Sequence, residues 1–143
     1  MKEMKDIPIF FAVDDGYLPF LGVSLKSLID NSSKENRYAI KILYTNVSKE
    51  NMFKIKQYEC ENINIEFVDL NEQLKEIKEK LYTRNYFSNT TYFRLFLPEL
   101  YPQYDKAIYI DSDTIVLADM AELYNIDIGD NLLAGVPDGA VQT

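Results

Sequence analysis

Apolar residues along the chain follow two alternating patterns: short β-branched or aromatic runs, and longer stretches that carry a single apolar stripe. The short runs end at polar clusters, which is typical of buried strands. The stripes, such as Leu21, Leu25 and Leu28, recur every three or four positions and predict helices that pack one face on a sheet. We predict strands at 7–13, 38–44, 63–68, 107–110 and 132–136, and helices from Pro19 to about Asn31, at 48–58, from Asn71 past Leu81, at 90–97 and at 120–123.

Local signals agree with several of these helix boundaries. Pro19 suits a first helical turn, and Ser48 can cap the next helix with Glu50 near its positive end. Pro98 is expected to stop the helix at 90–97. The alternation of strands and helices predicts an α/β fold with a mostly parallel sheet and helices on both faces. A chain of 143 residues is long enough for one such domain.

Two carboxylates, Asp111 and Asp113, follow the predicted strand at 107–110 with only Ser112 between them. On an extended chain such side chains point to the same side, with Cα atoms roughly 6.5–7 Å apart. The carboxyl end of a strand is where ligands usually bind in α/β sheets. Two such aspartates on their own more often form a turn or a cap. The context here predicts that both hold one hard divalent cation facing a phosphate-bearing ligand.

The first predicted strand also ends in two carboxylates, Asp14 and Asp15, which are followed by Gly16 and Tyr17. Asp14 could accept a hydrogen bond from the edge of a base, and Tyr17 could stack on a flat heterocycle. Gly16 would allow a close approach of the backbone. The alternative is an Asp-Gly turn that leads into a capped helix. The residues alone leave both interpretations open.

Arg94 lies in the predicted helix at 90–97, three positions after Thr91 and therefore on the same helix face. Apolar residues flank Arg94 on both sides, so we expect its guanidinium near the core, where it needs an anionic partner. One hypothesis is a contact with a diphosphate or with sugar hydroxyls. The other is a structural salt bridge, with Asp111 as a candidate partner.

Composition excludes several classes of function. The chain has 23 acidic and 15 basic residues, a net charge of −8, which argues against nucleic acid as a partner. An acidic protein that binds a diphosphate needs a cation as mediator. The sequence has no histidine, and therefore no imidazole ligand, Ser–His triad or histidine base. Cys60 is the single cysteine and fits a reducing compartment. The apolar run at 7–13 is too short to cross a membrane, so we expect a cytoplasmic protein.

Three segments, 11–17, 90–95 and 109–114, resemble in this order the pattern of glycosyltransferase family 8. That family holds bacterial lipopolysaccharide galactosyl- and glucosyltransferases and the glycogenins, and the resemblance runs from residue 7 to about 138. It implies a GT-A fold, a UDP-glucose or UDP-galactose donor and a Mn²⁺ or Mg²⁺ cofactor. It also implies a glycan or lipid-linked saccharide acceptor, as in lipopolysaccharide biosynthesis, with retention of the anomeric configuration.

The resemblance also implies roles for individual residues. Asp14 and Tyr17 would hold the uracil, the backbone of Ala12 would add contacts, and the backbone of Ser112 would meet the ribose. Many relatives have Asn at the position of Gly16, so a side-chain contact is not expected there. The nucleotide-binding set is Ala12, Asp14, Asp15, Gly16, Tyr17, Arg94, Asp111 and Ser112, the metal pair is Asp111 and Asp113, and Arg94 is the candidate catalytic residue through stabilisation of the leaving group.

The family's third metal ligand, a histidine, and its Lys-Pro-Trp-like segment at the diphosphate have no counterpart in this sequence. We therefore expect residues 1–143 to be the nucleotide-sugar-binding part of a GT-A domain, cut short at its C-terminal end. Such a chain would expose apolar surface and favour self-association. The missing region would contact the inner face of the membrane.

Two other functions are compatible with parts of this pattern. A haloacid-dehalogenase-like phosphohydrolase also ends a strand in Asp-x-Asp, with the first Asp as nucleophile and the second as acid. That motif normally falls near the N-terminus and carries Thr or Val where this chain has Ile115. A non-catalytic UDP-binding domain is the second alternative, and turnover of a donor sugar would separate it from an enzyme.

Overall fold

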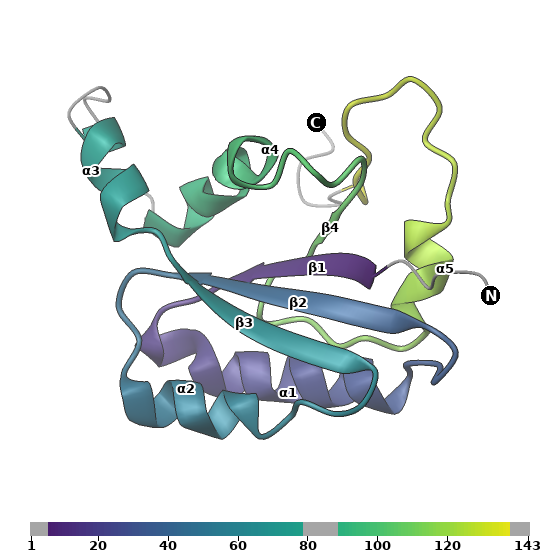
Figure 1. Ribbon diagram of the computed structural model, residues 1–143, viewed down its shortest axis with the longest axis horizontal. Coiled ribbons are helices and arrows are strands. Elements are labelled where there is room, and N and C mark those ends of the chain that lie inside the picture. The colour runs from purple at the N-terminus through teal and green to yellow at the C-terminus, as the bar shows by residue number, and fades with distance from the viewer. Residues whose placement is uncertain (1–5, 79–88, 138–143) are drawn as a thin grey trace.

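A computed structural model describes residues 6–78 and 89–137 of the chain (Figure 1). Four strands, β1 (Asp6–Ala12), β2 (Arg37–Tyr44), β3 (Ile63–Asp69) and β4 (Ile108–Tyr109), form one sheet in the order β3-β2-β1-β4. All three strand pairs are parallel. The helices are η1 (Asp15–Tyr17), α1 (Leu18–Asp30), α2 (Lys49–Lys56), α3 (Asn71–Lys78), η2 (Asn89–Phe96), α4 (Leu97–Leu100) and α5 (Met120–Tyr124).

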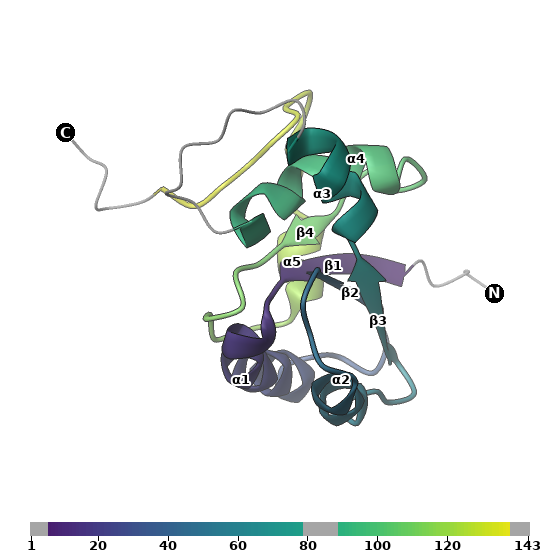
Figure 2. The ribbon, with the colours of Figure 1, turned by 90° about the vertical axis from the view of Figure 1, so that its left-hand side faces the viewer.

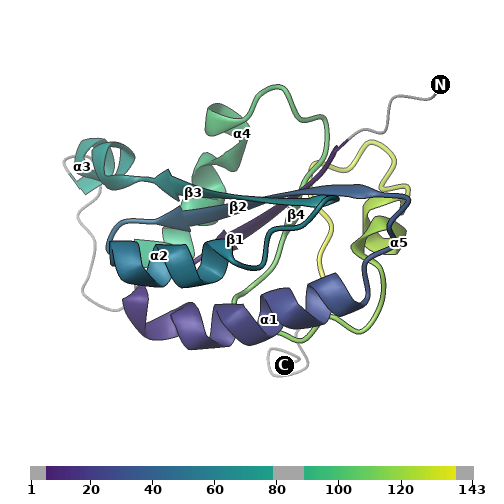
Figure 3. The same cartoon turned by 60° about the horizontal axis from the view of Figure 1, so that its bottom comes forward.

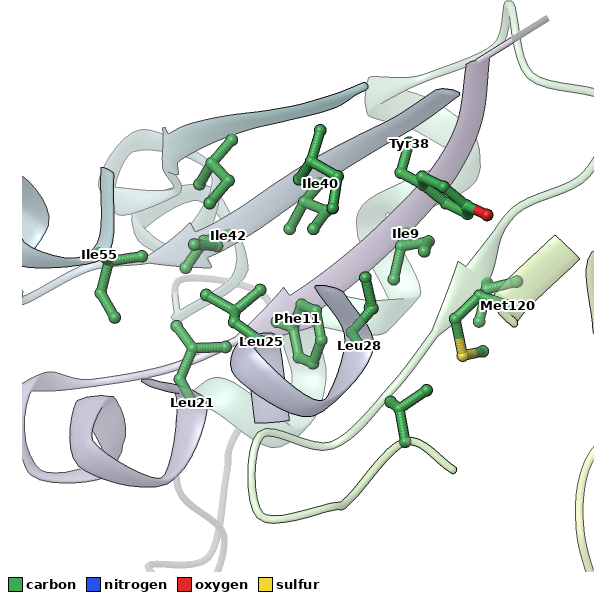
Figure 4. Close-up of a cluster of buried hydrophobic side chains, with 14 of the residues drawn as sticks. Ile9, Phe11, Leu21, Leu25, Leu28, Tyr38, Ile40, Ile42, Ile55 and Met120 are labelled. Atoms are coloured by element: carbon green, nitrogen blue, oxygen red, sulfur yellow. The ribbon is translucent and has the colours of Figure 1, made fainter. Parts of the chain in front are cut away.

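Helices α1 and α2 cover one face of the sheet (Figures 1 and 3). Alternate residues of the strands, such as Ile9 and Phe11 in β1 and Ile40 in β2, point to this face and are fully buried against Leu25 and Leu28 of α1 (Figure 4). This alternation follows from the pleat, which sends successive side chains to opposite faces. Helix α5 adds Met120 to the same core.

Helices α3 and α4, with η2 between them in the chain, lie on the opposite face, as the edge-on view in Figure 2 shows. The second core forms here around Phe10, Leu43 and the fully buried Phe93 of η2. Tyr101 and Tyr104 contact the Phe10 ring edge-on, with centroids 5.0 and 6.4 Å away. Helices therefore cover both faces of a parallel sheet, as the strand–helix alternation predicts.

The strand order places a topological switch point between β1 and β4. From β1 the chain moves to β2 and then to β3 on one side, whereas β4 lies on the other side of β1. The chain leaves β1 for α1, and the segment that follows β4 is hydrogen-bonded to α1 and its cap through Val116. The turns after β1 and β4 therefore lie at the carboxyl ends of two neighbouring parallel strands. In open α/β sheets this is the usual place for a ligand.

Three predicted elements differ in the structure. The apolar segment 132–136 is no strand, and Leu132 and Leu133 are almost fully exposed; apolar residues form a strand only where a neighbouring strand supplies hydrogen bonds. The segment 89–96 is a 3-10 helix rather than an α-helix. Pro98 does not stop a helix but occupies the first turn of α4, where its missing N–H costs nothing. Leu81 lies outside the described residues.

Within the described part of the chain, no helix combines the length and the apolar character that a membrane span requires.

Candidate functional site

The turn after β1 is organised by Asp14. Its Oδ1 accepts hydrogen bonds from the backbone N–H groups of Gly16 and Tyr17, at 2.9 and 3.2 Å. Asp14 is extended and caps η1, so its carboxylate satisfies donors that a helix start leaves unpaired. The Asp-Gly turn anticipated as an alternative is therefore present. The carboxylate has a second oxygen, so a local cap does not conflict with contact to a ligand.

Asp15 ties this turn to α2. Its Oδ1 accepts from the Ser48 backbone N–H and from Asn51 Nδ2, both at 3.0 Å. The hydrogen bond from the Ser48 backbone, followed by that from Asn51, lowers the pKa of Asp15 below its ordinary value. The Asp15 carboxylate therefore connects the turn after β1 to the start of α2 through hydrogen bonds. A direct contact of Asp15 with nucleotide stays a prediction.

Tyr17 lies at the start of α1 with about half of its surface exposed. Its ring lies 5.7 Å from that of Phe20, with the planes tilted by 45°, so one aromatic face has a neighbour and the residue still reaches solvent. A Cβ on Gly16 would come within 3.3 Å of Asp14 Oδ1. A larger residue at this position would therefore press on the cap. Ala12, at the end of β1, is buried.

Asp111 and Asp113 lie after β4 and are both exposed, whereas Ser112 between them is buried. The extended geometry expected for these residues is wrong, because Ser112 and Asp113 form a turn. The ladder with β1 ends where the Ile110 N–H donates to the Phe10 carbonyl, 3.0 Å away. Past that point β1 continues beside β2 as far as Ala12, and Thr114 Oγ1 donates to the Asp111 carbonyl at 2.8 Å.

The segment after this turn is held by α1. Ser27 Oγ accepts from the Val116 N–H at 2.9 Å, and Asn31 Nδ2 donates to the Val116 carbonyl at 3.0 Å. Ser27 is not among the site residues predicted from the sequence. The sequence signal that could have pointed to it is Ser24, a polar residue within the stripe of leucines, which the structure shows to be fully buried.

Arg94 is exposed, and the expectation that its neighbours would hold it in the core is wrong. Phe93 takes the buried position and leaves the next side chain at the surface. The Arg94 guanidinium lies 5.0 Å from the centre of the Tyr109 ring, a cation–π contact. Burial and the nearby charge of Asp111 raise the pKa of Tyr109, while Arg94 acts against them. Arg94 and Asp111 are thus both close enough to Tyr109 to influence its pKa, in opposite directions. The Thr91 side chain lies outside what the structure describes.

The donor set suits a hard divalent cation that shares its coordination with a ligand. Residues 6–78 and 89–137 contain no group of three His, Cys, Asp or Glu side chains placed to hold a metal. Asp111 and Asp113 supply two exposed carboxylates on one turn. Mg²⁺ is usually bound by one or two carboxylates together with substrate phosphates and water, and Mn²⁺ favours the same oxygen ligands. The pair therefore fits such an ion when a diphosphate is present.

The carboxyl ends of β1 and β4 thus carry two acidic turns on either side of a switch point, the usual ligand position in open parallel α/β proteins. The sequence pattern of Glycosyl transferase family 8 matches residues 8–143, and the chain belongs to this family.

A Haemophilus influenzae protein whose name assigns it to the glycosyltransferases is 34% identical over 132 residues, covering 91% of this chain and 38% of that protein. General stress protein A of Bacillus subtilis is 24% identical over 141 residues, with 96% and 48% covered. The chain spans less than half the length of both relatives.

Solved structures agree on the fold. The bifunctional glycosyltransferase WbbM superposes with a TM-score of 0.79 at 35% identity, over 93% of this chain and 23% of that one. The galactosyltransferase LgtC, solved with donor and acceptor sugar analogs, gives a TM-score of 0.67 at 28% identity, over 87% and 44%. The fold is of the GT-A type. The haloacid dehalogenase alternative is set aside by this family and this fold.

Proposed function

We propose that this chain carries the nucleotide-sugar site of a metal-dependent, retaining hexosyltransferase that uses UDP-glucose or UDP-galactose. The observation that carries the proposal is the pairing of the turn at Asp14 with the turn at Asp111 across the β1–β4 switch point. The LgtC complex with donor and acceptor sugar analogs supports it by relation. The acceptor would be a glycan or a lipid-linked saccharide.

In this proposal the turn after β1 binds the nucleoside part of the donor, and the turn after β4 binds its diphosphate through the metal ion. Tyr17 stacks on the uracil, Asp14 accepts from the base edge, and Ala12 adds its backbone. Asp111 and Asp113 would hold Mn²⁺ or Mg²⁺, which when bound neutralises charge on the diphosphate. The backbone of Ser112 lies beside the ribose.

Arg94 would act on the leaving group. Cleavage of the bond between sugar and phosphate leaves negative charge on UDP, and a guanidinium fixed over Tyr109 supplies a preorganised positive charge. We assign no nucleophile and no general base to residues 1–143. Self-association and contact with a membrane surface stay predictions.

The test is titration of UDP with and without Mn²⁺ by calorimetry, in the 143-residue chain and in Asp113→Asn. We expect Mn²⁺ to strengthen UDP binding in the parent chain. In Asp113→Asn this strengthening should be at least about tenfold smaller, a difference of ~1.4 kcal/mol in binding free energy. Asp130→Asn is the matched control, because it makes the same charge change at an exposed position on another loop. Equal, metal-independent binding in all three proteins would refute the proposal.

Release of UDP from UDP-glucose and UDP-galactose is the second measurement. Release of UDP from one of these two sugars identifies the donor and supports the proposal that the protein is an enzyme. Metal-dependent binding without turnover, in this chain and in any longer protein that contains it, would support the non-catalytic UDP-binding domain instead.

A further inference from the structure

Side chains of α1 hold the chain between Asp111 and Val116 through two short relays of hydrogen bonds. In the first, the Val116 N–H donates to Ser27 Oγ at 2.9 Å, and Ser27 donates to the Ser24 carbonyl at 2.7 Å. In the second, Thr114 Oγ1 donates to the Asp111 carbonyl at 2.8 Å and lies 3.4 Å from Ser24 Oγ. A hydroxyl has one proton, so Ser24 is the donor in that contact.

Asn31 completes the attachment from just beyond the end of α1. Its Nδ2 donates to the Val116 carbonyl at 3.0 Å and to the Ser27 carbonyl at 2.9 Å. Both backbone polar groups of Val116 are therefore bound by α1 or its cap. A neighbouring strand would supply the same two bonds in a sheet. Since β4 ends at Tyr109, α1 takes over where the ladder stops.

This attachment is well shielded at its centre. Ser24, Ser112 and Val116 are all buried, and a buried polar group that loses its partner is costly. The position of the Asp111–Asp113 turn is therefore set by α1 and not only by β4. The same helix begins directly after Tyr17. Helix α1 therefore continues from the turn at 14–17, which we call the nucleoside turn because the proposed function places the uracil there, and it also holds the acidic turn at 111–113.

We propose that Ser27 and Asn31 are positioning residues for the metal pair, coupling the Asp111–Asp113 turn to the Tyr17 turn through α1. This inference rests on the proposed function. It predicts that loss of the attachment misplaces the carboxylates while the nucleoside turn stays intact. Outer-shell partners of metal ligands typically contribute about 10–100-fold to metal affinity, and we expect an effect near the lower end, because β4 still holds the turn from the other side.

The readout is the manganese enhancement, the ratio of UDP dissociation constants without and with Mn²⁺. We expect Ser27→Ala to reduce this ratio by roughly tenfold and to leave UDP binding without Mn²⁺ within about twofold. Ser27→Thr keeps the hydroxyl and should restore most of the ratio. Ser32→Ala is the matched control: Ser32 Oγ donates to the Leu28 carbonyl at 2.7 Å, a similar bond that does not involve the acidic turn. Asn31 is exposed, so Asn31→Ala serves if Ser27→Ala does not fold.

The outcomes separate the two claims. If the parent chain shows no manganese enhancement, the proposed function fails, and the inference fails with it. If the parent shows it and both Ser27→Ala and Asn31→Ala keep it, only the inference fails. A purely structural role would lower UDP binding equally with and without Mn²⁺ and would also refute the inference. Faster amide hydrogen exchange at Val116 in Ser27→Ala, but not in Ser32→Ala, would support the attachment independently of any ligand.

Discussion

Asp119 offers the strongest test of how the segment after the acidic turn is fixed to the fold. Its Oδ1 accepts from Tyr38 Oη at 2.5 Å and from the Ala121 N–H at 2.8 Å. Its Oδ2 accepts from the Ser33 N–H at 3.0 Å and from Asn36 Nδ2 at 3.3 Å. One carboxylate thus caps α5 and joins it to the start of β2 and to the loop after α1. Asp119→Ala removes all four bonds at once.

The magnitude follows from the partners. Tyr38 is only 1% exposed, so its hydroxyl loses a charged acceptor without access to water, at about 1–2 kcal/mol. Loss of the α5 cap costs about 1 kcal/mol, and the Ser33 and Asn36 bonds add less because water can replace them. We expect Asp119→Ala to lower the free energy of unfolding by about 3 kcal/mol.

Urea unfolding followed by circular dichroism measures this loss. At a slope of about 1.5 kcal/mol/M the midpoint should fall by about 2 M. Tyr38→Phe removes one of the four bonds and should cost about 1–1.5 kcal/mol. The double variant should then be less destabilised than the sum, with a coupling of about 1 kcal/mol. A loss under about 1 kcal/mol in Asp119→Ala, or additive costs in the cycle, would refute this account of Asp119.

Two further predictions concern the nucleoside turn and the response to pH. Tyr17→Phe should bind UDP almost normally and Tyr17→Ala should lose roughly 1–3 kcal/mol of binding free energy, because stacking uses the ring face and not the hydroxyl. Calorimetry measures this, with Phe20→Ala as a neighbouring control. Unchanged UDP binding in both Tyr17 variants would contradict the uracil site. Burial alone would raise the pKa of Asp119, but the hydrogen bonds from Tyr38, Ala121, Ser33 and Asn36 outweigh it and lower the pKa. The unfolded chain therefore takes up this proton first as pH falls, so the stabilisation is present above about pH 4 and is lost below it. Melting temperatures between pH 3 and 7 should fall less steeply on the acid side in Asp119→Asn than in the parent chain, and parallel curves would rule this contribution out.

The sheet and its first two helices were predictable because their patterns are unambiguous. β1, β2, β3, α1 and α2 lie within a few residues of the predicted ranges, since alternating or helical apolar spacing over seven or more residues has few other solutions. The segment 132–136 has a similar composition but no strand beside it among the described residues, so pattern alone could not decide its state. Whether 89–96 forms a 3-10 or an α-helix depends on tertiary packing around Phe93, which no local signal encodes.

The candidate site was predictable in position but less so in geometry. Strand ends followed by carboxylates placed both turns correctly at the carboxyl ends of β1 and β4. The turn at Ser112 and Asp113 was missed because it forms where β4 loses its partner, and strand pairing is a long-range property. Ser27 was missed because its acceptor role depends on Val116, 89 positions away in the chain.

Under the proposed function, the length of α1 between Tyr17 and Ser27 sets the spacing between the Tyr17 turn and the Asp111–Asp113 turn. Ser27 lies nine positions after Leu18 in α1, a rise of about 13.5 Å along the helix axis. A single inserted residue between them would rotate Ser27 by about 100° and carry it away from Val116, whereas four inserted residues would nearly restore the direction but lengthen the span by about 6 Å. Natural or designed variants should therefore keep a constant number of residues in this stretch of α1.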